Sequence, residues 1–210
     1  MKKQKNWRLA LAMLAALTLG SCSSDDDDDF TTEQIQRTYF LMKDRYAGTM
    51  TVTEQGEAPR QSQTYTAMTT QSAEELTVAI PLEQVASQLS NETMVARIRE
   101  VGFAKVKATY EFTNIDEGGA HFVLHPQMVY DEQLCLPATR TQPVTYQGLT
   151  LLFNHDRGGD FVKENGALDF TLCVGGVLID NHYVDGFTPI VYHFSGMSTT
   201  KDMNGELEKK

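Results

Sequence analysis

Apolar and polar residues alternate along most of this sequence after its first 45 positions. The pattern is clearest from Lys105 to Thr113, where every second residue is apolar. Successive side chains of a strand point to opposite faces, so this spacing predicts strands with one buried face. Apolar residues at every second position recur in further predicted strands: Tyr46 to Val52, Leu76 to Ile80, Leu149 to Phe153, Leu168 to Val174 and Ile190 to Phe194. Another strand is predicted near Val177 to Tyr183. The chain is therefore predicted to be built mainly from strands.

Two parts of the sequence have helical spacing instead. Ile35, Tyr39 and Met42 fall on one face of a helix that a threonine at position 31 or 32 can cap. A short helical pair is predicted near 82–101, with Pro81 opening its first helix and Asn91 capping its second. Residues 31–197 then form a single globular domain, followed by a polar tail over 198–210.

Short turns rich in glycine, aspartate and asparagine join the predicted strands, so neighbouring strands should pair with each other antiparallel. The expected fold class is α+β and mostly antiparallel β. We expect a curved meandering sheet or partial barrel of about nine to ten strands, with the N-terminal helix and the helical pair covering one face or end. A β-sandwich is the alternative architecture.

The first 22 residues have the pattern of a lipoprotein signal peptide. Four basic residues precede the uncharged run from Leu9 to Leu19, which as a helix would cover about 16 Å, half of a bilayer core. That length suits a signal-peptide core and not a membrane span. The sequence Leu19, Gly20, Ser21, Cys22 resembles a lipobox, at which the cysteine is lipidated and the chain is cut before it. Residues 1–21 are thus the predicted signal peptide, and Cys22 the lipidated first residue.

An acidic segment follows the lipobox and completes a predicted tether over 22–30. Its residues are Ser23, Ser24, Asp25, Asp26, Asp27, Asp28 and Asp29. Like charges of this density repel one another and favour a solvated spacer. The segment also resembles the surface-export signal of outer-membrane lipoproteins in the Bacteroidetes. That resemblance implies a domain anchored by lipid in the outer membrane and facing outward.

The charge of the chain excludes one class of partner. The formal net charge is −10, and loss of the signal peptide removes four basic residues and no acid. Binding of nucleic acid depends on clustered lysine and arginine, which this balance does not provide. The expected partners are a membrane through the lipid anchor and an extracellular or periplasmic ligand or protein, with no nucleic acid, cofactor or metal.

Two polar loops are candidate ligand sites. One carries His155, Asp156, Arg157 and Asp160, and the other carries Asp180 and Asp185. Glycine-rich strand connections explain both loops without a ligand. Neither a G-x-S-x-G elbow nor an H-E-x-x-H pair occurs, so no catalytic residue is predicted. The alternative function, a surface hydrolase using acids of the 155–185 loops, requires those acids to line one pocket.

The cysteines allow two interpretations. Cys135 and Cys173 are the only ones left once Cys22 is lipidated. Export permits a disulfide between them. Both lie among apolar strand residues, so two buried free thiols fit equally well.

Several motifs together resemble a family of small Bacteroidetes lipoproteins that consist of a domain of unknown function. They are the lipobox with its acidic spacer, the Tyr46-x-Gly48-Thr49 strand and the closing YHFSG at Tyr192 to Gly196. The resemblance covers most of the mature chain and implies no catalytic residues. The Tyr-x-Gly-Thr strand is also similar to calycin-type barrels, which bind apolar ligands in the barrel mouth. The expected function is a non-catalytic ligand- or partner-binding module on the outer membrane.

Overall fold

The computed structural model describes residues 30–56, 62–72, 74–130 and 148–200. The fold described below belongs to the unit that begins at Thr31. Its helices are α2 (Thr32–Met42), α3 (Glu83–Ser87) and α4 (Glu92–Val101). Its strands are β1 (Arg45–Glu54), β2 (Gln63–Gln71), β3 (Glu75–Pro81), β4 (Phe103–Ile115), β5 (Gly119–Pro126), β6 (Val129–Tyr130), β7 (Leu149–Phe153), β8 (Gly158–Val162), β9 (Ala167–Ile179), β10 (His182–Tyr183) and β11 (Ile190–Ser198). No helix in these ranges is long and apolar enough to cross a membrane.

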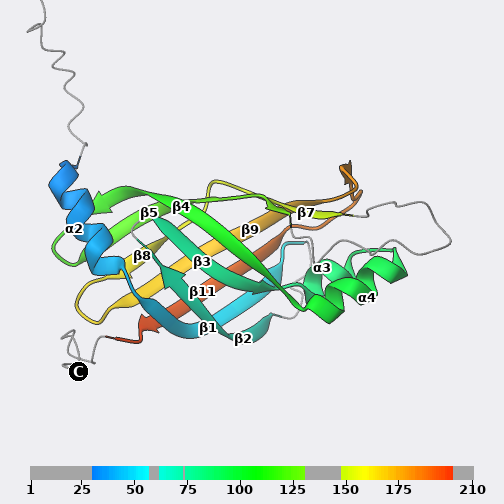
Figure 1. Ribbon diagram of the computed structural model, residues 1–210, viewed down its shortest axis with the longest axis horizontal. Helices are drawn as coiled ribbons and strands as arrows, with labels where there is room; N and C mark the ends of the chain where they lie inside the picture. Colours follow the sequence, from blue (N-terminus) through cyan, green and yellow to red (C-terminus); the bar gives the residue numbers. More distant parts are fainter. Residues whose placement is uncertain (1–29, 57–61, 73, 131–147, 201–210) are drawn as a thin grey trace, which may run out of the picture. The chain divides into compact units, whose positions relative to one another are not determined.

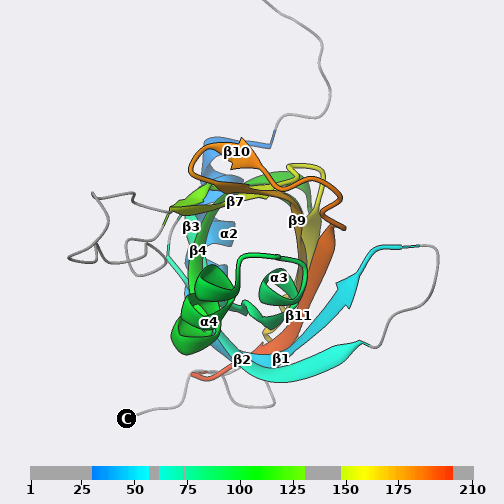
Figure 2. The ribbon, with the colours of Figure 1, turned by 90° about the vertical axis from the view of Figure 1, so that its right-hand side faces the viewer.

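Eight of the strands close into an antiparallel barrel (Figures 1 and 2). Around the barrel they follow the order β1, β2, β3, β4, β5, β8, β9 and β11, and β11 pairs with β1 to complete the circuit. The far half of β9 extends past β8 and pairs instead with β7 and β10, while β6 pairs with β7. The predicted class, mostly antiparallel β with an N-terminal helix and an inserted helical pair, is confirmed. The sheet closes fully, so the sandwich alternative does not apply.

The predicted alternation places the apolar side chains inside the barrel. In β4 the buried residues Ala104, Val106, Ala108 and Tyr110 alternate with exposed ones along the strand. Large side chains fill the interior, and Phe170 of β9 stacks on its cross-strand partner Phe194 of the neighbouring strand β11, with ring centroids 5.0 Å apart. A core of this kind stabilises the barrel through burial of apolar surface.

The first and last strands meet at a seam that contains two glycines. Gly48 of β1 lies directly opposite Gly196 of β11, and Met50 lies opposite Phe194. A Cβ atom on Gly48 would lie 2.0 Å from the carbonyl oxygen of Ser195, so the backbones here approach more closely than any side chain allows. The Tyr46-x-Gly48-Thr49 and YHFSG motifs are thus paired with each other, and they close the barrel.

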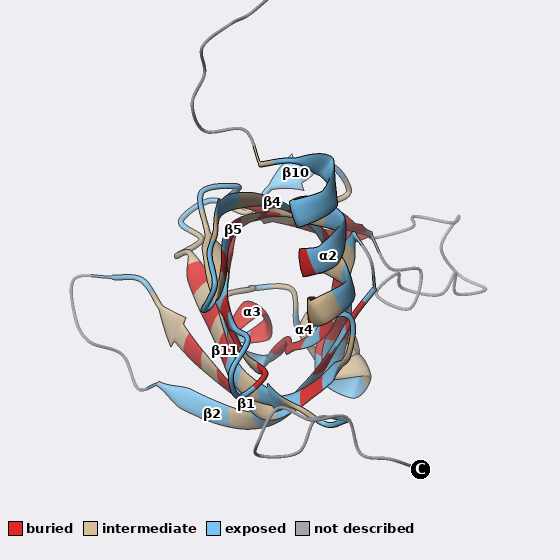
Figure 3. Cartoon of the chain, turned by 90° about the vertical axis from the view of Figure 1, so that its left-hand side faces the viewer, coloured by how far each residue is buried: buried red, intermediate tan, exposed pale blue. Residues whose placement is uncertain are grey.

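Helix α2 lies across one end of the barrel, which Figure 3 shows from that side. Thr31 and Gln34 form a capping box at its start, which confirms the predicted cap. Tyr39 packs against Tyr110 and Phe112 of β4, with ring centroids 5.2 and 5.1 Å apart. The Tyr46 hydroxyl donates a hydrogen bond of 2.6 Å to the carbonyl of Met42, which fixes the end of α2 to β1.

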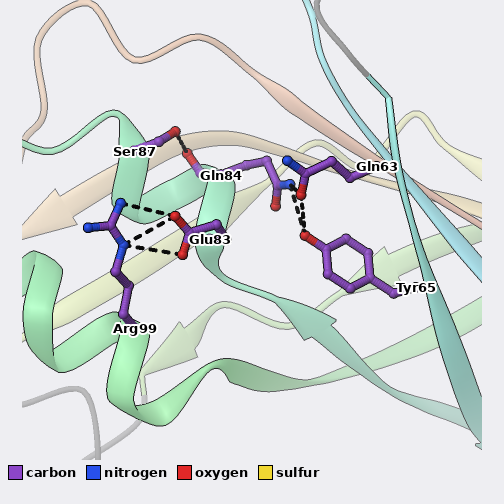
Figure 4. A network of polar contacts seen from close by, with 6 residues as sticks. All are labelled: Gln63, Tyr65, Glu83, Gln84, Ser87 and Arg99. Carbon is purple, nitrogen blue, oxygen red and sulfur yellow. Dashed lines mark hydrogen bonds and ion pairs between the residues drawn. The ribbon is translucent and has the colours of Figure 1, made fainter.

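Helices α3 and α4 close the opposite end (Figure 2). The side chain of Gln84 on α3 is buried and donates to the Gln63 side-chain oxygen at 2.8 Å and to the Tyr65 hydroxyl at 3.1 Å (Figure 4). Arg99 of α4 donates to both carboxylate oxygens of Glu83 on α3, which joins the two helices. The helical pair is therefore joined to β2 and covers this end of the barrel.

Two predicted boundaries differ in the structure. Pro81 does not open a helix, because it is the last residue of β3, opposite Phe103, and α3 starts at Glu83. Proline is tolerated there because the end of a strand does not need its amide donor. The segments predicted as separate strands near Leu168 to Val174 and from Val177 are one strand, β9. Asp180 and Asn181 then form the turn to β10, with φ of 52° and 63°.

Candidate functional site

Several predicted functional residues lie outside the residues that the structure describes. These are the lipidated Cys22, the acidic segment Ser23, Ser24, Asp25, Asp26, Asp27, Asp28 and Asp29, and Cys135. Their roles therefore stay predictions. The remaining candidates all fall in described parts of the chain.

The first candidate loop does not gather its polar groups around one point. His155, Asp156 and Arg157 lie between β7 and β8, where Asp156 is 3.7 Å from the Arg157 guanidinium. Asp160 belongs to β8 and contacts the His121 ring on the neighbouring strand β5. The His155 ring stacks instead on His125, 6.2 Å away between centroids. The polar groups of the loop therefore have separate partners and do not converge on one site.

The second loop is far from Asp160 along the barrel. Asp160 is the cross-strand partner of Asp169 on β9, and Asp180 follows β9 at its other end. About 35 Å of extended chain separates Asp169 from Asp180, at ~3.3 Å per residue. Asp180 accepts a hydrogen bond from the backbone of Gly148 at 2.8 Å, which fixes the turn. Asp160 and Asp180 therefore do not line one concave pocket as the hydrolase alternative requires.

An outer-wall row of acids and histidines was not predicted. Asp160 and Asp169 lie side by side on β8 and β9, with His121 against the first and His193 2.8 Å from the second. Like charges in opposite positions of a sheet are unfavourable, and here each carboxylate has a histidine ring as its polar neighbour. No group of three or more histidine, cysteine, aspartate or glutamate residues within the described ranges is arranged to hold a metal ion.

Cys173 is a buried free thiol on β9. The amide of Asn154 lies 3.5 Å from its sulfur. Burial is the main cause that raises the pKa of the Cys173 thiol; the nearby Arg157 lowers that pKa and Asp156 raises it. A raised pKa keeps this thiol protonated, and the thiol is a weaker nucleophile than the thiolate.

A slot of about 630 Å³ opens at the α2 end of the barrel. One wall is a face of α2, and the other consists of the β4–β5 turn and the end of β8. Its lining residues are Gln34, Arg37, Thr38, Leu41, Ile115, Asp116, Glu117, Gly119, Phe161 and Lys163. The volume falls within the usual range for small-molecule sites, ~300 to 1,000 Å³. We refer to this cavity as the α2 slot.

Helical spacing explains how α2 forms one wall of the slot. Arg37 and Thr38 both lie three or four residues from Gln34 and from Leu41, so the four share one face of the helix. The neighbouring face, which carries Tyr39, packs on β4 instead. The helix thus contacts the barrel on one side and leaves the other side open to the slot.

The floor of the slot is apolar and its rim is polar. Among the lining residues Phe161 and Thr38 are buried and Leu41 and Ile115 are half-buried, whereas Arg37 and Lys163 are exposed, so we call the first group the floor and the exposed polar residues the rim. Arg37 and Lys163 stand on opposite walls of the rim. Sequence reasoning missed this site, because only the spacing of the α2 face was visible in the sequence.

Comparisons with known proteins add no relative: a scan against protein-family models, a search of curated proteins and a search of solved structures each found no match.

Proposed function

We propose that this chain is a non-catalytic binding module, anchored by lipid at Cys22 to the outer membrane and facing outward, which binds a small ligand in the α2 slot. The main support for ligand binding is the composition of the α2 slot. It combines an apolar floor at Phe161 with a polar rim in a concavity of about 630 Å³, which is the usual composition of a ligand site.

The position of the slot favours binding at the barrel mouth over binding deep inside the barrel. Tyr46, Phe170, Tyr192 and Phe194 are fully buried and occupy the barrel interior. A ligand there would have to displace close-packed side chains, which is costly. The slot offers apolar contact without that cost.

The groups that line the slot also favour binding over catalysis. The Thr38 hydroxyl already donates to the carbonyl of Gln34 at 2.8 Å. Asp116 accepts hydrogen bonds from the amides of Gly118 and Gly119 at 2.7 and 2.9 Å, so its carboxylate is bound in its own turn. A nucleophile beside a general base, the arrangement that covalent hydrolysis needs, is not found among the lining residues.

Attachment to the membrane is tested by removing the acylated thiol. The Cys22→Ala chain should no longer incorporate radiolabelled palmitate and should leave the membrane fraction, because the lipid provides the anchor. A companion chain with alanine at residues 25–29 should stay in the membrane but lose protease accessibility on whole cells. If Cys22→Ala remains membrane-bound and labelled, the anchor is elsewhere; if accessibility is unchanged in the companion, the aspartates are only a spacer.

Ligand binding is tested by methyl NMR on the mature chain, Cys22 to Lys210, carrying Cys22→Ser so that it has no lipid. A panel of ten-carbon amphiphiles should shift the methyl signals of Leu41 and Ile115 in the slot. The Ile80 methyl signals, near the opposite end of the barrel, serve as the internal control. A panel in which every compound leaves Leu41 and Ile115 unshifted contradicts the proposed function.

A further inference from the structure

We infer that the α2 slot takes an amphiphile with an anionic head group, such as a carboxylate, and an aliphatic tail. The inference rests on the proposed function and specifies its ligand. Two features of the slot support an anionic amphiphile: its unpaired polar groups are mainly hydrogen-bond donors, and its buried lining is mainly apolar.

The free polar groups of the rim are mainly donors. Arg37 and Lys163 have no ion-pair partner among the residues that the structure describes. Gln34 uses its side-chain oxygen to accept from the amide and hydroxyl of Thr31, at 2.8 and 2.9 Å, which leaves its NH₂ group to donate. Guanidinium, ammonium and amide groups all bind carboxylate or phosphate oxygens.

The acceptors of the rim are largely occupied. One carboxylate oxygen of Asp116 receives the amides of Gly118 and Gly119, and the other lies 3.4 Å from the Asn114 amide. Of the two acids that line the slot, only Glu117, an exposed residue of the β4–β5 turn, has a carboxylate without such a contact to the described residues. A ligand that supplies acceptors therefore matches the rim better than one that supplies donors.

The floor determines where the rest of the ligand lies. Leu41 and Ile115 face the slot from opposite walls, and Phe161 forms its base. An aliphatic tail placed there would remove apolar surface from water, at about 25 cal/mol for each Å². The head group would then lie at the rim between Arg37 and Lys163, since those side chains stand on the two walls.

The cations occur in a chain with a surplus of acid. Elsewhere in the described residues, Arg99 pairs with Glu83 at 3.0 Å and Lys107 with Glu75 at 2.9 Å. Carboxylate partners are abundant in this chain, yet Arg37 and Lys163 line the slot without an ion-pair partner among the described residues. These two cations are therefore well placed to bind a ligand anion. The acids Asp116 and Glu117 balance their charge, so the selectivity should come from direct hydrogen bonds and not from a long-range field.

The test compares head groups on one tail length. Decanoate, decyl phosphate, decan-1-ol and decyltrimethylammonium are titrated separately into the mature Cys22→Ser chain, below their micelle concentrations, with calorimetry and the Leu41 and Ile115 methyl signals as readouts. Decanoate should bind about 10-fold more tightly than decan-1-ol, equivalent to one charge-assisted hydrogen bond. If decyl phosphate binds most tightly, the ligand is a phosphate-bearing lipid. If decanoate binds most tightly, the ligand is a free fatty acid. Both results support an anionic head group.

Single substitutions identify the residues that bind the head group. Lys163→Gln and Arg37→Gln should each weaken decanoate about 5- to 10-fold and leave decan-1-ol unchanged. Lys105→Gln, on an exposed position of β4 outside the slot, is the matched control and should change neither. Equal binding of decan-1-ol and decanoate, or preference for decyltrimethylammonium, would overturn the anionic head while the proposed function stands. Failure of all four probes to shift Leu41 and Ile115 would overturn both.

Discussion

Replacing Gly48 with alanine should destabilise the barrel by about 3 to 4 kcal/mol, one of the larger effects expected of a single substitution. The new Cβ would lie 2.0 Å from the Ser195 carbonyl oxygen and 2.4 Å from the Cα of Gly196. Both are backbone atoms of β11, so the seam between the first and last strands has to move apart. Thermal unfolding followed by circular dichroism should show a midpoint lower by roughly 10 °C.

Gly56→Ala is the matched control for this substitution. Its Cβ would meet only a methyl group of Thr188, at 4.0 Å, which is ordinary contact. The midpoint should therefore stay within the small range typical of surface changes, about 0.5 kcal/mol. Equal midpoints for Gly48→Ala and Gly56→Ala would show that the seam is not closed as described.

The free energy of unfolding should fall steeply as the pH rises above about 10. Burial is the main cause that raises the pKa of the Tyr46, Tyr110 and Tyr192 hydroxyls well above the ordinary value near 10. The folded chain therefore keeps these protons at a pH where the unfolded chain releases them. Stability is full below about pH 10 and falls as the pH rises above it, by about 1.4 kcal/mol per tyrosine for each pH unit, or about 4 kcal/mol for all three.

Urea unfolding from pH 9 to 11.5 measures this slope, and tyrosinate absorbance should appear together with unfolding. The only tryptophan, Trp7, lies in the predicted signal peptide, so the absorbance of the mature chain is not obscured. Tyr192→Phe should reduce the slope by about 1.4 kcal/mol per pH unit. Tyr183→Phe removes a phenol that is 72% exposed and should leave the slope unchanged. A tyrosinate signal that rises while the domain remains folded contradicts the burial of these hydroxyls.

The strands and helices were predictable because their signals are local. The period of two in β4 and the threonine that caps α2 act over a few residues, and both predictions are confirmed. Closure of the barrel was not predictable in this way. It depends on Gly48 meeting Gly196, two residues far apart in the chain, and no local pattern specifies which distant strand completes a sheet.

The α2 slot could not be predicted from the sequence either, because it also depends on contacts between distant segments. Arg37, Ile115 and Lys163 come from three separate segments that only the closed barrel brings together. The glycine-rich loop at His155 was more conspicuous in the sequence, because its polar residues are adjacent in the chain. Adjacent polar residues of a strand connection pair locally, as Asp156 and Arg157 do, and need not form a site.

The most direct test of ligand binding in the slot is to fill the slot with a larger side chain. Leu41→Trp places an indole on the slot face of α2, and Phe40→Trp places one on a position of the same helix that is 77% exposed. Each variant, in the mature Cys22→Ser chain, is titrated with decanoate by calorimetry. We predict that Leu41→Trp loses binding, while Phe40→Trp binds decanoate as the parent chain does. Decanoate binding that is equally strong in Leu41→Trp, or that is lost equally in Phe40→Trp, would contradict the assignment of the α2 slot as the ligand site.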